Sequence, residues 1–279
     1  MIGNRRKTIA SIGLYAVIAL AVVFLLFPLY WMFVTSVRPD NTLLTYPPQF
    51  LPTDGGWQAY QRVLTQSLIF RWFLNSTIVT GFTIALSVPI SALAGYAISR
   101  FRYLGIREIG YSLLIARMLP SSLLIIPLYF IFARLGLLNN YLALVIANTT
   151  FVIPFSTWMM KGFFDSIPRE LEDAAQIDGA SALASLLRVV MPLSLPGLAA
   201  TTIYAAILTW GEFVFASTLL TGPERWTGPI GITSFIQQYL IQWNDIMAAS
   251  LIYILPVIIL FAFLERYLVQ GLAAGSVKQ

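Results

Sequence analysis

The chain has 279 residues, of which 58% are hydrophobic and only 10% are charged, and its mean hydropathy is +0.79. A soluble domain carries about 25% charged residues, so too few polar side chains remain to coat a soluble particle, and the composition predicts a membrane protein. The absence of cysteine and histidine removes thiol nucleophiles, thiolate metal sites and the commonest general base. The formal charge of +5 comes without a basic cluster, so it does not indicate nucleic-acid binding.

Six segments have the length and apolar character of a transmembrane helix. About 20 apolar residues, each rising about 1.5 Å, cross roughly 30 Å of hydrocarbon. The first segment follows Arg5, Arg6 and Lys7, as in a signal peptide, but its apolar run is too long for one, so we keep it as a helix. We therefore expect an all-α membrane protein, with one domain over residues 1–279 and spans near residues 14–37, 75–98, 109–132, 141–163, 197–220 and 247–268.

The distribution of lysine and arginine predicts the orientation of the chain. Basic residues accumulate on the cytoplasmic side of membrane proteins. With both termini in the cytoplasm, eleven basic residues lie inside and five lie outside, so we expect a multi-pass inner-membrane protein of this orientation. The inner residues are Arg5, Arg6, Lys7, Arg100, Arg102, Arg107, Lys161, Arg169, Arg188, Arg266 and Lys278, and the outer ones are Arg38, Arg62, Arg71, Arg134 and Arg225.

The longest inner connection, residues 162–196, has the pattern of a helix, a glycine and a second helix. Ser166 is a candidate N-cap, Pro168 suits a first helical turn, and the acidic residues that follow lie where the helix dipole favours anions. Gly179 then ends the helix, as glycine commonly does. A helix of about ten residues reaches only about 15 Å, so we expect it to lie at the inner surface.

Two features of this connection bear on what it contacts. Ala174 and Ala175 stand beside an acidic rim and would allow a groove on another protein to approach closely. Four apolar residues that follow at helical spacing are expected to pack back on the helix bundle: Leu183, Leu186, Leu187 and Val190. A surface hairpin without a partner is the alternative interpretation.

Residues 170–181, which read Glu-Leu-Glu-Asp-Ala-Ala-Gln-Ile-Asp-Gly-Ala-Ser, resemble the EAA loop of ABC importer permeases. The likeness is to the carbohydrate-uptake branch, typified by the smaller maltose-permease subunit. The chain departs from that pattern at Asp173, where the family usually has glutamate, and at Gly211, where this branch often has asparagine. Other matching segments follow in order along almost the whole chain: residues 28–36, 75–76, 97–102, 136–140, 187–196, 210–213 and 268–278.

The resemblance implies a type I, maltose-permease-like fold with six transmembrane helices. In such importers the short loop helix docks into a cleft of a cytoplasmic ATPase, and closure of the ATPase dimer rotates the transmembrane halves. The implied partners are a homologous second permease subunit, an ABC ATPase dimer, an extracytoplasmic solute-binding protein, the lipid bilayer and a sugar substrate. The resemblance assigns ATPase coupling to Glu172, Asp173, Ala174, Ala175, Asp178 and Gly179.

The sequence contains no Gly-x-x-x-x-Gly-Lys-[Ser/Thr] motif, which would cradle the phosphates of a nucleotide. We therefore expect the chain not to be an enzyme and to hold no cofactor or metal of its own. ATP and magnesium would be bound by the ATPase subunits.

Five residues are candidates for the translocation path. Arg117 and Glu212 are ionisable groups within predicted spans, where a charge needs a partner or water, and they are able to pair with each other. Asn75, Asn148 and Trp210 offer amides and an aromatic face, the kinds of group that bind sugars. Packing within the bundle and the aromatic belts of membrane proteins explain such residues equally well.

The outer segment of residues 228–249 carries apolar and aromatic residues at amphipathic spacing, with amides between them. In the resembling family a loop at this place faces the binding protein. The candidates for that contact are Phe235, Gln238, Tyr239 and Trp243. An ordinary interfacial helix has the same pattern.

These observations predict a permease subunit of an ATP-driven importer, which carries a sugar, expected to be a di- or oligosaccharide, by alternating access. The alternatives are the same machinery importing glycerol phosphate or a polyol, an ion-coupled secondary transporter, and an intramembrane enzyme. Few carboxylates lie in the spans and no inverted repeat is detectable, which weighs against a secondary transporter. The sequence shows no nucleophile–base pair, which weighs against an intramembrane enzyme.

Overall fold

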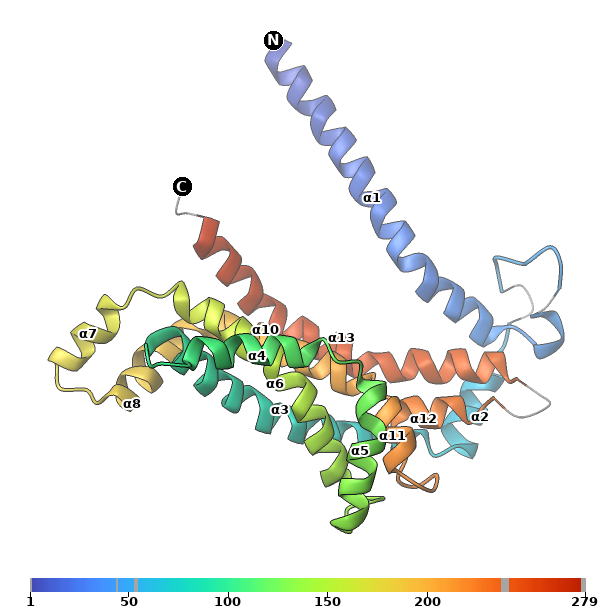
Figure 1. The fold of residues 1–279 in the computed structure, drawn as a ribbon. Helices are drawn as coiled ribbons and strands as arrows, with labels where there is room; N and C mark the ends of the chain where they lie inside the picture. The colour runs from blue at the N-terminus through green and yellow to red at the C-terminus, as the bar shows by residue number, and fades with distance from the viewer. Residues whose placement is uncertain (1, 44, 53–54, 237–240, 277–279) are drawn as a thin grey trace. The chain divides into compact units, whose positions relative to one another are not determined.

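The computed structural model describes all residues except 1, 44, 53–54, 237–240 and 277–279. Over the described residues the secondary structure is helical, apart from one isolated antiparallel bridge between Ile236 and Ile241 (Figure 1). The expectation of an all-α protein is confirmed. The elements are α1 (Ile2–Val37), the 3-10 helix η1 (Asp40–Thr42), α2 (Gln58–Gln66), α3 (Ile69–Arg100), α4 (Ile106–Arg117), α5 (Ser121–Arg134), α6 (Tyr141–Asp165), α7 (Glu170–Ile177), α8 (Ala182–Ser185), the π-helical turn η2 (Leu186–Val190), α9 (Met191–Leu193), α10 (Leu195–Trp210), α11 (Val214–Leu219), α12 (Gly228–Thr233) and α13 (Trp243–Ser276).

Four helices are long and apolar enough to cross a membrane. They are the segments Ser11–Val37, Ile69–Arg100, Tyr141–Asp165 and Trp243–Tyr267, and each overlaps a predicted span. Two further pairs of helices pass the same test together but are sharply bent, by 99° between α4 and α5 and by 76° between Ala182–Leu193 and α10. Counting each bent pair as one span gives the six that the sequence predicts.

The predicted span over residues 109–132 is broken instead of being one straight helix. Helix α4 ends at Arg117 and α5 begins at Ser121, with Pro120 in an extended conformation between them. Proline lacks an N–H group and disfavours a helical conformation in the residue before it, which explains the break at this point. The predicted span over residues 197–220 is also broken, because α10 ends at Trp210 and α11 begins only at Val214.

The chain forms two compact units. Unit 1 consists of Met1–Ile69 and Ile232–Ile254, and unit 2 consists of Phe70–Gly231 and Leu255–Gln279. That residues 1–279 act as one transmembrane domain stays a prediction.

Unit 1 is held together by a partly buried ion pair between α2 and the start of α13. The Arg62 guanidinium binds both carboxylate oxygens of Asp245, with Nη2–Oδ1 at 2.6 Å and Nε–Oδ2 at 3.0 Å. The side chain of Asp245 is almost fully buried, and its hydrogen bond is the largest cause of the raised pKa of the Arg62 guanidinium. Ser36 and Tyr60 join α1 to α2 through hydroxyl groups 2.9 Å apart.

Unit 2 has two apolar cores that lie toward different ends of helix α6. One core surrounds Leu144 and takes Phe132 from α5 with Phe215 and Leu219 from α11. The other surrounds Phe164 and includes Tyr96, Met160, Leu186 and Val190, from α3, α6 and η2. Within this unit, helices α7 and α8 lie at the opposite end from α5 and α11 (Figure 1). Helix α6 therefore joins two regions that are well separated.

Helices α3 and α6 approach each other closely at Gly95. A Cβ atom on Gly95 would lie 2.8 Å from the carbonyl oxygen of Thr157 and 2.9 Å from the backbone nitrogen of Lys161. Small residues allow such close packing of transmembrane helices, and fully buried hydroxyl residues on α3 continue this side of the helix: Thr83, Ser87 and Ser91. The contact at Gly95 fixes the distance between the two helices.

Replacing Gly95 by alanine is expected to destabilise the protein by about 1–3 kcal/mol, because the added methyl group meets backbone atoms that cannot rotate away. The measurement is the midpoint of thermal unfolding in detergent. Gly81→Ala on the same helix is the matched control, since a Cβ there meets nothing within 4 Å. Equal midpoints for the two variants would contradict the close approach.

Candidate functional site

The inner connection folds as the helix, glycine and helix that its sequence predicts. Helix α7 ends before Gly179, whose φ of +90° is a left-handed conformation that favours glycine. The amide of Gly179 donates to the carbonyl of Gln176, and Ser181 then caps α8 by accepting from the amide of Ala184. The predicted N-cap role of Ser166 is wrong, because its hydroxyl donates to the carbonyl of Phe163 and closes the end of α6 instead.

One face of this connection is exposed. Of the residues assigned to ATPase coupling, Asp173, Ala174, Asp178 and Gly179 are exposed and Ala175 is half-buried. The sequence reasoning missed Ile177, whose side chain is 87% exposed although it is large and apolar. Ile177 therefore adds an apolar side chain to the exposed carboxylates of this face. Ile177 is the last residue of α7, and its position in the sequence gives no signal of its exposure.

The apolar residues that follow α7 do not all pack on the bundle. Leu186 and Val190 are buried in the core around Phe164, as predicted. Leu183 and Leu187 are exposed, so the prediction for them is wrong. Residues four apart share one helix face, and in so short a segment only the face of Leu186 and Val190 meets the bundle.

Glu172 does not belong to the exposed face, although the resemblance assigns it to ATPase coupling together with Asp173. Its side chain is only 6% exposed, although it lies on α7 beside the exposed Asp173. Its carboxylate accepts a hydrogen bond from the Tyr96 hydroxyl at 2.7 Å and another from Arg100 Nε at 2.5 Å. Both donors come from the last turns of α3, so Glu172 fixes α7 to that helix.

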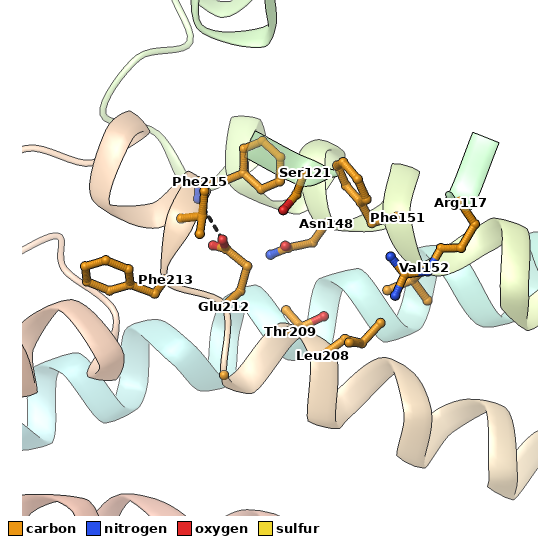
Figure 2. Close-up of a pocket in the computed structure, with 12 residues that line it drawn as sticks. Arg117, Ser121, Asn148, Phe151, Val152, Leu208, Thr209, Glu212, Phe213 and Phe215 are labelled. Carbon is orange, nitrogen blue, oxygen red and sulfur yellow. Dashed lines mark hydrogen bonds between the residues drawn. The ribbon is translucent and has the colours of Figure 1, made fainter. Parts of the chain in front are cut away.

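At the other region of unit 2, a pocket of about 260 Å³ lies where two helices are broken (Figure 2). The break between α4 and α5 and the break between α10 and α11 both contribute to its wall. In a membrane, irregular backbone is tolerated where it lines a cavity or is buried in protein. The lining residues are Arg117, Ser121, Asn148, Phe151, Val152, Leu208, Thr209, Gly211, Glu212, Phe213, Val214 and Phe215.

Two buried polar atoms of this pocket have no hydrogen-bond partner among the described residues. They are Nδ2 of Asn148 and the hydroxyl oxygen of Thr209. Both residues are at least nine-tenths buried. A buried polar group without a partner is costly, so these atoms are suited to bind a polar ligand or water. The sequence reasoning named Asn148 but missed Thr209, which comes directly before Trp210 in α10.

Arg117 and Glu212 both line the pocket, but they do not form the ion pair that the sequence allowed. The Glu212 carboxylate accepts from the backbone amides of Phe215 at 2.7 Å and Ala216 at 3.0 Å. Figure 2 shows Arg117 on the far side of the pocket, with Asn148 between the two charged groups. The carboxylate therefore caps the first turn of α11, as an acidic side chain does at a helix start.

The remaining two candidates for the translocation path lie outside this pocket. The Asn75 side chain donates to the carbonyl oxygens of Glu224 at 2.9 Å and Trp226 at 2.8 Å, so it holds the connection after α11. Trp210 packs edge-on against Phe73 and lines a separate cavity of about 200 Å³. The structure thus brings together three of the five candidates: Arg117, Asn148 and Glu212.

The candidates for the binding-protein contact are only partly described. Gln238 and Tyr239 lie outside the described residues. Phe235 is half-buried and Trp243 is exposed at the start of α13. Helix α12 ends at Thr233, so Phe235 does not continue it. Their contact with a binding protein stays a prediction.

If Glu212 acts as a helix cap, Glu212→Ala should destabilise the protein by about 1–2 kcal/mol, the usual effect of losing a cap. Arg117→Gln should leave the stability unchanged, because Arg117 is not the partner of that carboxylate. Thermal unfolding of both variants in detergent measures the difference. An ion pair between the two residues would instead make both variants unstable.

Comparison with known proteins identifies the chain. It is 32% identical to the diacetylchitobiose uptake system permease protein DasC of Streptomyces coelicolor, over 91% of this chain and 92% of that protein. It is 34% identical to the trehalose/maltose transport system permease protein MalG of Thermococcus litoralis, over 98% and 99%. A chain in the crystal structure of a bacterial ABC transporter involved in the import of the acidic polysaccharide alginate matches with a TM-score of 0.78 and 26% identity, over 94% of this chain and 98% of that chain.

The family match covers most of the chain. The sequence pattern of the family described as "Binding-protein-dependent transport system inner membrane component" matches residues 87–274, which include α7, Gly179 and the whole pocket. This family consists of transport permeases and not of enzymes. The chain therefore belongs to the family of binding-protein-dependent transport system inner membrane components, and its resemblance to ABC importer permeases is confirmed.

Proposed function

We propose that this chain is a permease subunit of an ATP-driven importer that carries a di- or oligosaccharide across the cytoplasmic membrane by alternating access. The observation that carries the proposal is the exposed face of α7, where Ile177 and the carboxylates of Asp173 and Asp178 are free to contact another protein. Its relatives from Streptomyces coelicolor and Thermococcus litoralis are named for diacetylchitobiose and for trehalose and maltose. Those names support a sugar as the substrate.

The proposed partner at α7 is an ABC ATPase. Its cleft would receive Ala174 and Ala175, while Asp173 and Asp178 would pair with basic residues of the ATPase. This chain lacks the phosphate-binding motif, so ATP and magnesium would be bound by the ATPase dimer alone. The excess of basic residues in the segments on the α7 side supports an orientation with α7 and both termini in the cytoplasm.

The proposed assembly contains two further proteins. A second, homologous permease subunit would complete the pathway through the membrane. A solute-binding protein would deliver the sugar from the outer side, in agreement with the family description. The outer segment with Phe235 and Trp243 is the part of this chain proposed to meet it.

The pocket at the helix breaks is the proposed part of the translocation path. Its unpartnered groups, Nδ2 of Asn148 and the hydroxyl of Thr209, would form hydrogen bonds with sugar hydroxyl groups. The rings of Phe151 and Phe213 line the same pocket and offer flat apolar faces. A pocket with an apolar wall and a few polar groups is the usual form of a small-molecule site.

Reconstitution of the whole assembly tests the function. The chain is combined in proteoliposomes with a second permease subunit, an ABC ATPase and a binding protein, and ATP hydrolysis and uptake are measured for a panel of oligosaccharides and for glycerol phosphate. We expect hydrolysis and uptake to depend on the binding protein and on one or more oligosaccharides. Uptake that requires an ion gradient and ignores ATP would overturn the proposal, and uptake of glycerol phosphate alone would overturn its substrate class.

Gly179→Leu should uncouple ATP hydrolysis from transport. A residue with a side chain costs about 1–2 kcal/mol in a left-handed conformation, so the angle between α7 and α8 should change. We expect the ratio of sugar transported to ATP hydrolysed to fall at least several-fold. Gly179→Asn should be milder, because asparagine tolerates this conformation. Gly162→Leu is the control, since Gly162 is exposed on α6 and a Cβ there meets nothing within 4 Å.

Removing a polar group from the pocket should weaken sugar transport without affecting ATPase binding. Asn148→Ala and Thr209→Val should each raise the KM for uptake about fivefold, the effect of losing a hydrogen bond of about 1 kcal/mol. Thr83→Val is the matched control, because the Thr83 hydroxyl is also buried and unpartnered among the described residues but does not line the pocket. An unchanged KM in both pocket variants would contradict the proposal that the pocket is part of the translocation path.

A further inference from the structure

The last turns of α3 are bound to α7 by a buried arginine that donates three hydrogen bonds. Arg100 donates through Nε to Glu172 at 2.5 Å, through Nη2 to the carbonyl oxygen of Ile167 at 3.0 Å, and through Nη1 to the hydroxyl of Ser99 at 3.2 Å. The side chains of Arg100 and Glu172 are 8% and 6% exposed. All three guanidinium nitrogens are therefore used, and the arginine has one fixed geometry.

The same turn of α3 is also bound to the end of α6. The hydroxyl of Ser99 donates to Asp165 Oδ1 at 2.6 Å, and Lys161 Nζ donates to Asp165 Oδ2 at 2.5 Å. Arg169, just before α7, donates to the carbonyl oxygen of Ser99 at 2.8 Å. The ends of α3 and α6 and the start of α7 thus share one polar network.

Helix α7 consequently has one bonded face and one free face. Glu172 is bonded to α3, whereas the side chains of Asp173, Gln176 and Asp178 make no hydrogen bond or ion pair with the described part of the chain. A displacement applied to the free face moves the bonded face with it, because both belong to the same short helix. The movement reaches α3, because separating the buried ion pair of Glu172 and Arg100 is strongly unfavourable. The network at Arg100 then receives that displacement.

Helix α6 joins this network to the pocket. It carries Lys161 and Asp165 at one end and Asn148 and Val152 in the pocket wall. From Asn148 to Asp165 the continuous helix rises about 26 Å, at about 1.5 Å per residue. The helix is continuous over this length although it contains Pro154, so it is the covalent and hydrogen-bonded link between the network and the pocket wall.

We propose that Arg100 and Glu172 form the joint that transmits movement of α7 to α3 and α6, and through α6 to the pocket. The inference rests on the proposed function, since it needs an ATPase that moves α7. Within it, Arg100, Glu172 and Tyr96 are positioning residues that contact neither nucleotide nor sugar. This gives a role to residues 97–102, which the sequence matches to the family without assigning a task.

The test uses the complete reconstituted assembly and measures two quantities, the amount of ATPase that co-purifies and the sugar transported per ATP hydrolysed. Arg100→Gln and Glu172→Gln should keep the ATPase, because the free face of α7 is unchanged. The transport ratio should fall about tenfold, within the range for residues along a coupling network. Tyr96→Phe should lower it about twofold, since it removes one hydrogen bond and keeps the ring.

The exchanged double variant Arg100→Glu with Glu172→Arg separates a joint from a general loss of structure. It should raise the ratio above that of either single variant without restoring it fully, because the ion pair is re-formed with its charges reversed while the hydrogen bond of residue 100 to the Ile167 carbonyl is lost. Arg102→Gln and Glu170→Gln are the controls, as both residues are exposed beside the network and outside its bonds. They should leave the ratio unchanged.

Three results would overturn the joint: single variants with a normal ratio, single variants that lose the ATPase, or a double variant no better than the single ones. Loss of the ATPase would instead return Glu172 to the docking surface. Failure of the proposed function is recognised separately, because the unmodified assembly would then show no sugar-dependent ATP hydrolysis before any variant is made.

Discussion

A backbone amide or carbonyl without a hydrogen-bond partner is costly in hydrocarbon, and this constraint determines where the helices of this protein are broken. The break after α4 and the break after α10 both open onto the same pocket. At the second break the Glu212 carboxylate accepts from the amides of Phe215 and Ala216, which no preceding helical carbonyl would otherwise satisfy. The irregular backbone of both breaks thus lies at one place, where it lines the pocket.

Helix α6, which connects this pocket with the region of α7, contains Pro154 but is continuous in the structure. In such a helix a proline removes a backbone hydrogen bond and is tolerated when the neighbouring helices pack around it. Pro154 is buried within unit 2, and the close contact of Gly95 with the backbone of α6 lies beyond it, toward the end of α6 at Asp165. The continuity of α6 explains why a polar network at its end and a pocket near its start can be considered together.

Much of the fold follows from the sequence because it depends on local composition. Long apolar runs predicted the four unbroken spans. Gly179 predicted the turn after α7, where the backbone adopts a left-handed conformation that favours glycine. The helix breaks were less predictable. Pro120 lies at the break after α4, but the end of α10 carries no proline, and Gly211 alone does not distinguish a bend from a continuous helix. The start of α11 after this second break is fixed by the Glu212 carboxylate, which caps that helix.

The site was less predictable than the fold, because its groups are distant in sequence. Thr209 gives no signal of its own, and only its burial beside Asn148 marks it as a polar group of the pocket. The exposure of Leu183 and Leu187 depends on which face of their segment meets the bundle. The spacing of apolar residues in a sequence shows which of them share a helix face. It does not show which of two neighbouring faces packs against the bundle.

Glu172 and Asp173 show this limit most clearly, since they are adjacent carboxylates with opposite surroundings. Successive residues of a helix point about 100° apart, so one of the pair faces the bundle when the other faces away from it. Arg100, 72 residues earlier in the chain, decides which one is buried. The side chain of Glu172 reaches the guanidinium of Arg100, while Asp173 lies on the exposed face of α7. The two acidic positions of one motif therefore separate into an attachment within the subunit and a contact directed away from it.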